Sequence, residues 1–207
     1  STLFLVTNLA AAEVSKTEEY SYELKEGGRI SLSNVNGDVS IEGTDGRQVR
    51  IVATKKADSQ KYLDGMKIEI DASESAISIE TRHPDSGGGI LNWGGDDGGS
   101  VEYKLTVPRD VEIDSIETVN SDVVVGGVTG PISAESVNGE LDVTGASSNL
   151  SAETVNGTID VEFLQLGSGQ RVSADAVNGR IVLRLPSDAS ARVTAETLNG
   201  SIDGDDF

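Results

Sequence analysis

The chain has 207 residues, of which 36% are apolar and only 4% aromatic, with 24 glycines, 4 prolines and no cysteine. Its 16 basic and 35 acidic residues give a net charge of −19, which repels the phosphates of nucleic acid and of anionic lipid and so excludes nucleic-acid binding. The absence of cysteine excludes disulfides, thiolate zinc sites and a cysteine nucleophile.

The first twelve residues are typical of the end of a signal peptide. The apolar residues 3–6 are followed by Leu9 and by three alanines, and the polar part of the chain begins at Glu13. We therefore expect residues 1–12 to be a signal-peptide remnant and the mature chain to be exported to the periplasm, the cell envelope or the medium. The apolar run is too short to cross a bilayer and no other segment could, so no transmembrane segment is expected.

Residues 13–107 are expected to form a less regular β-strand part of the domain. Alternating apolar residues predict strands in residues 47–55 and 66–81, and the segment 57–65 between them predicts a short helix or turn. Residues 83–100 are rich in glycine and predict a flexible loop.

Residues 108–207 consist of repeats of one pattern, in which strand residues lead into an apolar residue followed by Asn-Gly. A looser copy surrounds Asn36, and in the copy at Asn120 the glycine is replaced by Ser121. This copy at Asn120 is also a looser one, and four regular copies follow it at Asn138, Asn156, Asn178 and Asn199. The five asparagines from Asn120 to Asn199 are separated by 18, 18, 22 and 21 residues. That period is the length of one rung of a repeat structure, so residues 13–207 are expected to form a single domain.

Two architectures fit each copy. Asn-Gly accepts the positive φ angles of a tight turn, so it could close a hairpin or form the corner of a β-solenoid (β-helix). In a hairpin the apolar residue before each Asn would point outward with the acidic residues, whereas in a solenoid it stacks on its equivalent in the next rung; these residues are Val137, Val155, Val177 and Leu198. The solenoid explains more of the pattern, and the Asn side chains could also form a ladder of amides. The fold prediction is therefore an all-β solenoid of short strands, with corners at Asn36, Gly37, Asn120, Asn138, Gly139, Asn156, Gly157, Asn178, Gly179, Asn199 and Gly200.

One position of the repeat is always alanine, which suggests a narrow point of the interior; these residues are Ala134, Ala152, Ala174 and Ala195.

The Val-Asn-Gly corners, the segment from Tyr103 to Pro108 and the signal remnant resemble an exported bacterial β-strand-repeat family of unknown function, whose members are labelled "putative adhesin". The resemblance runs from Ile30 to the end of the chain, and the sequence departs from it at Ser121. It implies a β-helical solenoid and a cell-envelope location, and it brings no catalytic or binding residues.

Little in the sequence points to catalysis. His83 is the only histidine, so a two-histidine metal site is excluded, and a catalytic triad would need this residue beside a glycine-rich loop. Acidic residues that would stack in a row recur in every copy, whereas a catalytic pair is normally one unrepeated place; they are Glu135, Glu153, Asp175 and Glu196. A solvated face that prevents strand pairing with other chains explains them better, and no catalytic residue is predicted.

Three residues of the glycine-rich loop are candidates for binding. Trp93 could stack on a sugar ring or enter a pocket of a partner, or it could cover the side or end of the solenoid. Asp96 and Asp97 offer oxygen ligands for Ca²⁺, but they match no calcium-binding motif, so a flexible acidic loop is favoured and no cofactor is expected.

The function that these patterns favour is a non-enzymatic adhesin or scaffold of the cell envelope or the medium, with a cell-surface glycan or protein as its partner. Two alternatives stay open. One is a polysaccharide-active β-helix enzyme, and the other is an envelope sensor or regulatory module that binds a protein.

Overall fold

In the computed structural model of this protein, residues 13–84 and 98–206 are described. Strands account for 70% of the structure and helix for 3%, which confirms the all-β prediction. The expected short helix is present as α1 (Gln60–Gly65), which begins after the N-cap Ser59. The strands are β1 (Val14–Glu23), β2 (Arg29–Asn36), β3 (Val39–Thr44), β4 (Gln48–Ala57), β5 (Lys67–Ala72), β6 (Ala76–Arg82), β7 (Gly99–Pro108), β8 (Glu112–Asn120), β9 (Val123–Gly126), β10 (Ile132–Asn138), β11 (Leu141–Ala146), β12 (Leu150–Phe163), β13 (Arg171–Leu185) and β14 (Arg192–Asp206).

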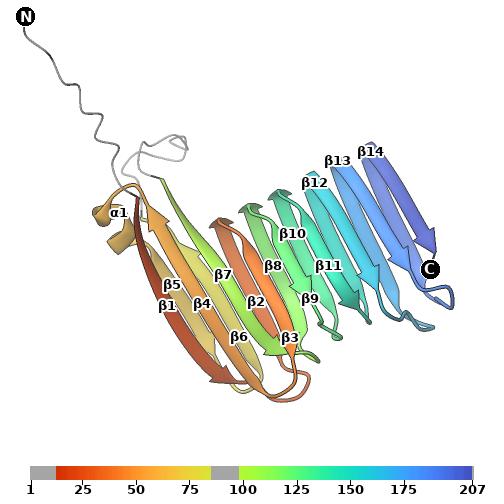
Figure 1. The fold of residues 1–207 in the computed structure, drawn as a ribbon, viewed down its shortest axis with the longest axis horizontal. Helices are drawn as coiled ribbons and strands as arrows, with labels where there is room; N and C mark the ends of the chain where they lie inside the picture. The colour runs from red at the N-terminus through yellow and green to blue at the C-terminus, as the bar shows by residue number, and fades with distance from the viewer. Residues whose placement is uncertain (1–12, 85–97, 207) are drawn as a thin grey trace, which may run out of the picture.

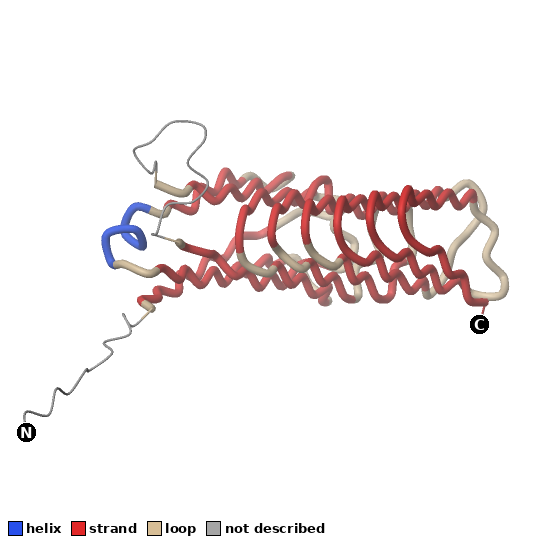
Figure 2. Tube along the Cα trace, turned by 90° about the horizontal axis from the view of Figure 1, so that it is seen from above, coloured by secondary structure: helices blue, strands red, loops and turns tan. Residues whose placement is uncertain are grey.

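The strands form one sheet that folds over on itself. Its path runs β1-β4-β7-β3-β9-β11-β12-β10-β8-β2-β6-β5, and β13 and β14 extend it from β12. Figure 1 shows the strands side by side along the long axis, and Figure 2 shows that they lie in two facing layers. The twelve strands of the path form a nearly closed, barrel-like sheet.

This path corrects the prediction of a uniform β-solenoid. A solenoid has parallel strands throughout, but here β1 pairs with β4, β4 with β7, and β5 with β6, all antiparallel. Within residues 13–107, β2 and β3 pair in parallel with their neighbours, as the repeats do. The antiparallel pairs are those that β1, β4 and β5 form at that end of the molecule.

From β8 onward the repeats stack in parallel. Successive copies pair strand on strand, and Asn138 aligns with Asn156, then Asn178, then Asn199. Each of β12, β13 and β14 is one continuous strand that passes through Asn-Gly and belongs to both layers. For example, β12 pairs with β10 in one layer and with β11 in the other. The chain therefore curves from layer to layer, as Figure 2 shows, with no separate turn in these three copies.

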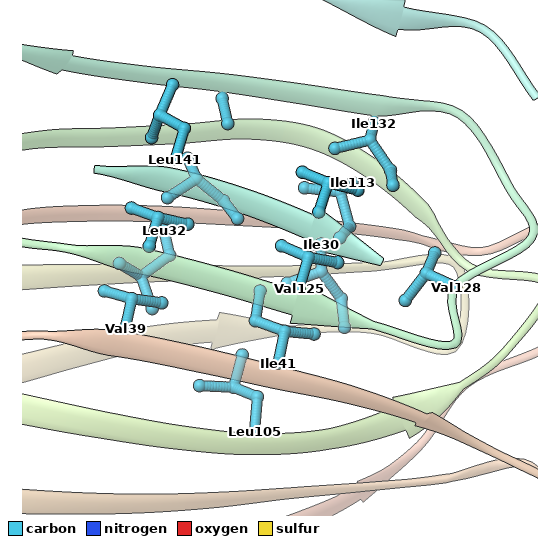
Figure 3. Packing of buried hydrophobic residues seen from close by; sticks show 14 of the residues in the cluster. Ile30, Leu32, Val39, Ile41, Leu105, Ile113, Val125, Val128, Ile132 and Leu141 are labelled. Atoms are coloured by element: carbon cyan, nitrogen blue, oxygen red, sulfur yellow. The ribbon is translucent and has the colours of Figure 1, made fainter. Parts of the chain in front are cut away.

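The space between the layers is filled by aliphatic side chains. Figure 3 shows Ile30 and Leu32 of β2 on one side and Val39 and Ile41 of β3 on the other, with further branched residues from β7 to β11 around them. All four are about 1% exposed. The alanine position of the repeat is buried in three copies and half-buried in the last strand; its residues are Ala134, Ala152, Ala174 and Ala195.

A buried ion pair lies at the antiparallel end. Lys55 Nζ lies 2.8 Å from Glu18 Oε1 and donates to the Met66 carbonyl at 3.1 Å, and the Tyr20 hydroxyl donates to Glu18 Oε2 at 2.6 Å. The hydrogen bond from Lys55, followed by that from Tyr20, lowers the pKa of Glu18 to about 2. The lysine is 7% exposed, so its partners are needed to stabilise a charge out of water.

Candidate functional site

The asparagines of the repeat form a continuous ladder of amides. The Asn138 side chain donates to Asn120 at 3.0 Å and accepts from Asn156 at 2.8 Å. The same bond joins Asn120 to Asn36 at 2.9 Å, Asn178 to Asn156 at 3.0 Å and Asn199 to Asn178 at 3.0 Å. Each amide donates in the same direction. The ladder therefore links six neighbouring strands, at the place where the chain passes from one layer to the other.

The glycine after each Asn is required by the closeness of the neighbouring strand. None of the described non-glycine residues has a positive φ, so the asparagines do not adopt the tight-turn conformation that Asn-Gly predicts. A Cβ on Gly157 would lie 1.9 Å from the Gly139 carbonyl oxygen, and one on Gly179 would lie 1.8 Å from that of Gly157. A Cβ on Gly139 or Gly200 would meet the preceding strand in the same way, at 2.0 and 1.7 Å. At these four positions only glycine fits, whereas the copy at Asn120 accommodates Ser121 in the same place.

The apolar residues before each Asn lie on the outside of the sheet, beside their equivalents in the neighbouring copies. Val35, Val137, Val155 and Val177 are 39–40% exposed, and Leu198 is 77% exposed. The residue before each of them points inward instead, because side chains alternate along a strand. Together with the half-buried Val119, these residues form an apolar row across six strands, which we call the valine row.

A row of carboxylates runs beside the valine row. Glu117 aligns with Glu135, Glu135 with Glu153, Glu153 with Asp175, and Asp175 with Glu196. These five residues, the acidic row, lie two positions before the valine row along each strand and point to the same side of the sheet. Within the described chain, none of the five forms an ion pair.

The two rows are the walls of a groove of about 650 Å³. Its floor consists of the small residues between them, such as Thr118, Ser136 and Thr154, which are at most 5% exposed. Their hydroxyls donate to backbone carbonyls, as Ser136 does to Ser121 at 3.3 Å, so they stabilise the bend of the chain. The groove is therefore acidic on one wall, apolar on the other, and repeats once per strand.

A second pair of acids aligns in the opposite layer. Asp142 of β11 lies beside Asp160 of β12, whose carboxylate is bound by the Arg184 guanidinium with one contact at 3.0 Å. Burial, followed by the nearby charge of Asp160, raises the pKa of Asp142. The arginine balances one of these two negative charges, unlike in the acidic row, where no ion pair forms within the described chain.

The binding candidates of the glycine-rich loop, Trp93, Asp96 and Asp97, lie outside the described residues, as does the signal remnant of residues 1–12. His83, at the start of that loop, is half-buried and its Nδ1 lies 3.4 Å from the Tyr62 hydroxyl of α1. Burial lowers the pKa of His83.

Across residues 13–84 and 98–206, no three His, Cys, Asp or Glu side chains come together in a way that could hold a metal ion. Of the helices in these ranges, none has the length and apolar character needed to cross a membrane.

Comparison with known proteins gives remote structural matches alone. Neither a protein-family model nor a curated protein sequence matches the chain. A "putative cell adhesion protein" from Clostridium sporogenes is 13% identical with a TM-score of 0.43, over 93% of this chain and 100% of that one. A "putative adhesin" from Bacteroides fragilis is 12% identical with a TM-score of 0.41, over 92% and 97% of the two chains. A "putative lipid binding protein" from Parabacteroides distasonis is 14% identical with a TM-score of 0.30, over 91% and 96%. The first two names agree with the adhesin family that the sequence resembles.

Proposed function

We propose that this protein is a non-enzymatic adhesin or scaffold of the cell envelope, exported from the cytoplasm, whose stacked repeats work as a solenoid-like stalk and present the groove to an extended ligand. The observation that carries the proposal is the groove, in which the same acidic and apolar side chains recur on strand after strand. A surface that repeats by translation suits a ligand that is itself long, such as a surface glycan or an extended protein segment.

The repetition also argues against catalysis. An active site is one place with unlike groups at defined distances, whereas every carboxylate of the acidic row has equivalents on the neighbouring strands. The exposed valine row adds a contiguous apolar stripe, a feature that marks interaction surfaces more often than reaction centres.

The test is a retention assay with the whole chain. The protein is mixed with intact bacteria and with a panel of envelope polysaccharides, and both retained protein and newly released sugar ends are measured. Retention without release is the expected result. Release of sugar ends would show a polysaccharide-active enzyme and overturn the proposal, and absence of retention on every cell and polymer would overturn it as well.

Two matched substitutions locate the binding surface. Val155→Ser removes an exposed valine from the groove, and Val124→Ser removes one that is 45% exposed on β9, outside the groove. Both are surface changes of the same chemistry, so both proteins are expected to fold. We expect the first to reduce retention and the second to leave it unchanged; equal effects would place binding elsewhere. Trp93→Ala tests the separate prediction that the glycine-rich loop contacts the ligand.

A further inference from the structure

The two walls of the groove differ in chemistry along its whole length. The acidic row and the valine row are separated by one inward-pointing residue on each strand, as Glu135, Ser136 and Val137 show. Residues two apart along a strand are about 6.7 Å apart. An α-helix, at about 10–12 Å across, is too wide to sink between rows this close, whereas one extended chain fits.

An extended polypeptide also matches the arrangement of the walls. Its successive side chains point to opposite sides. Lying along the groove, such a segment would therefore direct every second side chain to the acidic row and the others to the valine row. The groove crosses six neighbouring strands, β2, β8, β10, β12, β13 and β14. At about 4.8 Å per strand spacing this is about 24 Å, the length of seven or eight extended residues.

Charge determines what such a segment must carry. The groove is lined by Glu117, Glu135, Glu153, Asp175 and Glu196, and no basic residue lines it in the described part of the chain. Like charges directly opposite each other on neighbouring strands repel, and here four such pairs follow one another without an ion pair. A cationic ligand relieves this repulsion, and a neutral or acidic one does not.

We propose that the groove binds an extended polypeptide segment of about eight residues in which Lys or Arg alternates with apolar residues. The inference rests on the proposed function and specifies the ligand of the same groove. The basic side chains contact the acidic row, and the apolar side chains cover the valine row and remove it from water.

The experiment measures binding of two fluorescently labelled octapeptides to the whole chain by anisotropy. In the alternating peptide, lysine and valine follow one another in turn. The blocked peptide has the same composition and charge, but all its lysines precede all its valines, so it cannot place its side chains alternately. Because the protein has a net charge of −19, any polycation is attracted to some extent, and the blocked peptide measures that attraction. We expect the alternating peptide to bind at least tenfold more tightly than the blocked one.

Two double variants locate the site. Glu135→Gln with Glu153→Gln neutralises two groove carboxylates, and Glu140→Gln with Glu162→Gln makes the same change of charge outside the groove. We expect the first pair to weaken binding of the alternating peptide about tenfold and the second to alter it less than twofold. All four side chains are at least partly exposed, so the native circular dichroism spectrum is expected to persist in both proteins.

The outcomes separate the two proposals. Equal affinity for the two peptides, or equal weakening by both double variants, would show attraction by net charge alone and overturn the peptide inference. If the alternating peptide does not bind but the protein is retained on cells or glycans through Val155, the peptide inference falls and the proposed function stands. If neither peptide nor cell nor glycan is bound, both fall.

Discussion

Replacing Gly157 with alanine tests whether the close stacking of strands is what demands glycine in the repeat. The added Cβ would lie 1.9 Å from the Gly139 carbonyl oxygen, and this atom belongs to the backbone, so it cannot rotate away. The two strands must separate locally by about 1 Å or more before the contact becomes tolerable, since strand spacing is about 4.8 Å and van der Waals contact sets its lower limit.

The cost follows from the hydrogen bonds that bridge these strands at this point. The Gly139 amide donates to the Asn156 carbonyl at 3.1 Å, the Asn156 side chain donates to Asn138 at 2.8 Å, and the Thr154 hydroxyl donates to the Gly139 carbonyl at 3.5 Å. At about 1 kcal/mol net for each bond, losing the three lowers the free energy of unfolding by about 3 kcal/mol. For a chain of this size that is a fall in Tm of roughly 6–12 °C.

Urea denaturation followed by circular dichroism measures the change, and thermal unfolding checks it. Gly204→Ala is the matched control, because a Cβ on Gly204, also in a parallel strand, meets nothing within 4 Å. We expect the control to unfold within about 0.5 kcal/mol of the unaltered chain. If Gly157→Ala is as stable as the control, the stacking explanation of the repeated glycine is refuted.

Three further predictions concern the ladder and the titrating groups. Asn138→Asp keeps the shape of the side chain but cannot donate to Asn120, so we expect about 1 kcal/mol of destabilisation at pH 7 in urea denaturation. Lys55 and Tyr20 lower the pKa of Glu18 to about 2, so ionised Glu18 stabilises the fold above about pH 4.5 and this contribution is lost as the pH falls toward 2. The difference in unfolding free energy between the unaltered chain and Glu18→Gln should shrink over that range. Burial lowers the pKa of His83, so the unfolded chain binds a proton more readily and the free energy of unfolding falls as the pH drops below about 6.5. His83→Gln should remove this pH dependence. Unfolding free energies measured from pH 7.5 to 5 would show the difference.

The sequence predicts the repeated strands of this protein well, because their pattern can be recognised from residues that are close in the chain. Strict alternation through Ile132 and Ala134 identifies the buried face, and the 18–22 residue period identifies strands that stack in parallel. The antiparallel end could not be predicted in the same way. The pairing of β1 with β4, or of β4 with β7, depends on contacts between distant residues that leave no period in the sequence.

The groove is harder to predict for a different reason. The apolar character of Val137 predicts that it stacks on its equivalents in neighbouring copies, but it does not say on which side of the sheet that stack lies. Continued alternation from Ala134 places Ser136 inside and Val137 outside, as the structure does. A serine or threonine can be buried there because the bend of the chain exposes backbone carbonyls, such as that of Ser121, that accept its hydrogen bond. The signal was the small polar residue between two outward positions, and it recurs in most copies.

The register of the parallel stack also bears on how such a protein can change in length. Asn138 lies beside Asn156, 18 residues away, and the strands between them pair in parallel with those of the neighbouring copies. Duplicating such a segment would insert one further strand in each layer and lengthen the molecule by about 4.8 Å, while each old strand keeps its kind of neighbour. It would also add one acidic and one apolar residue to the groove. The valency of the surface, and with it the avidity for a long ligand, could therefore grow by duplication without the redesign of a single contact.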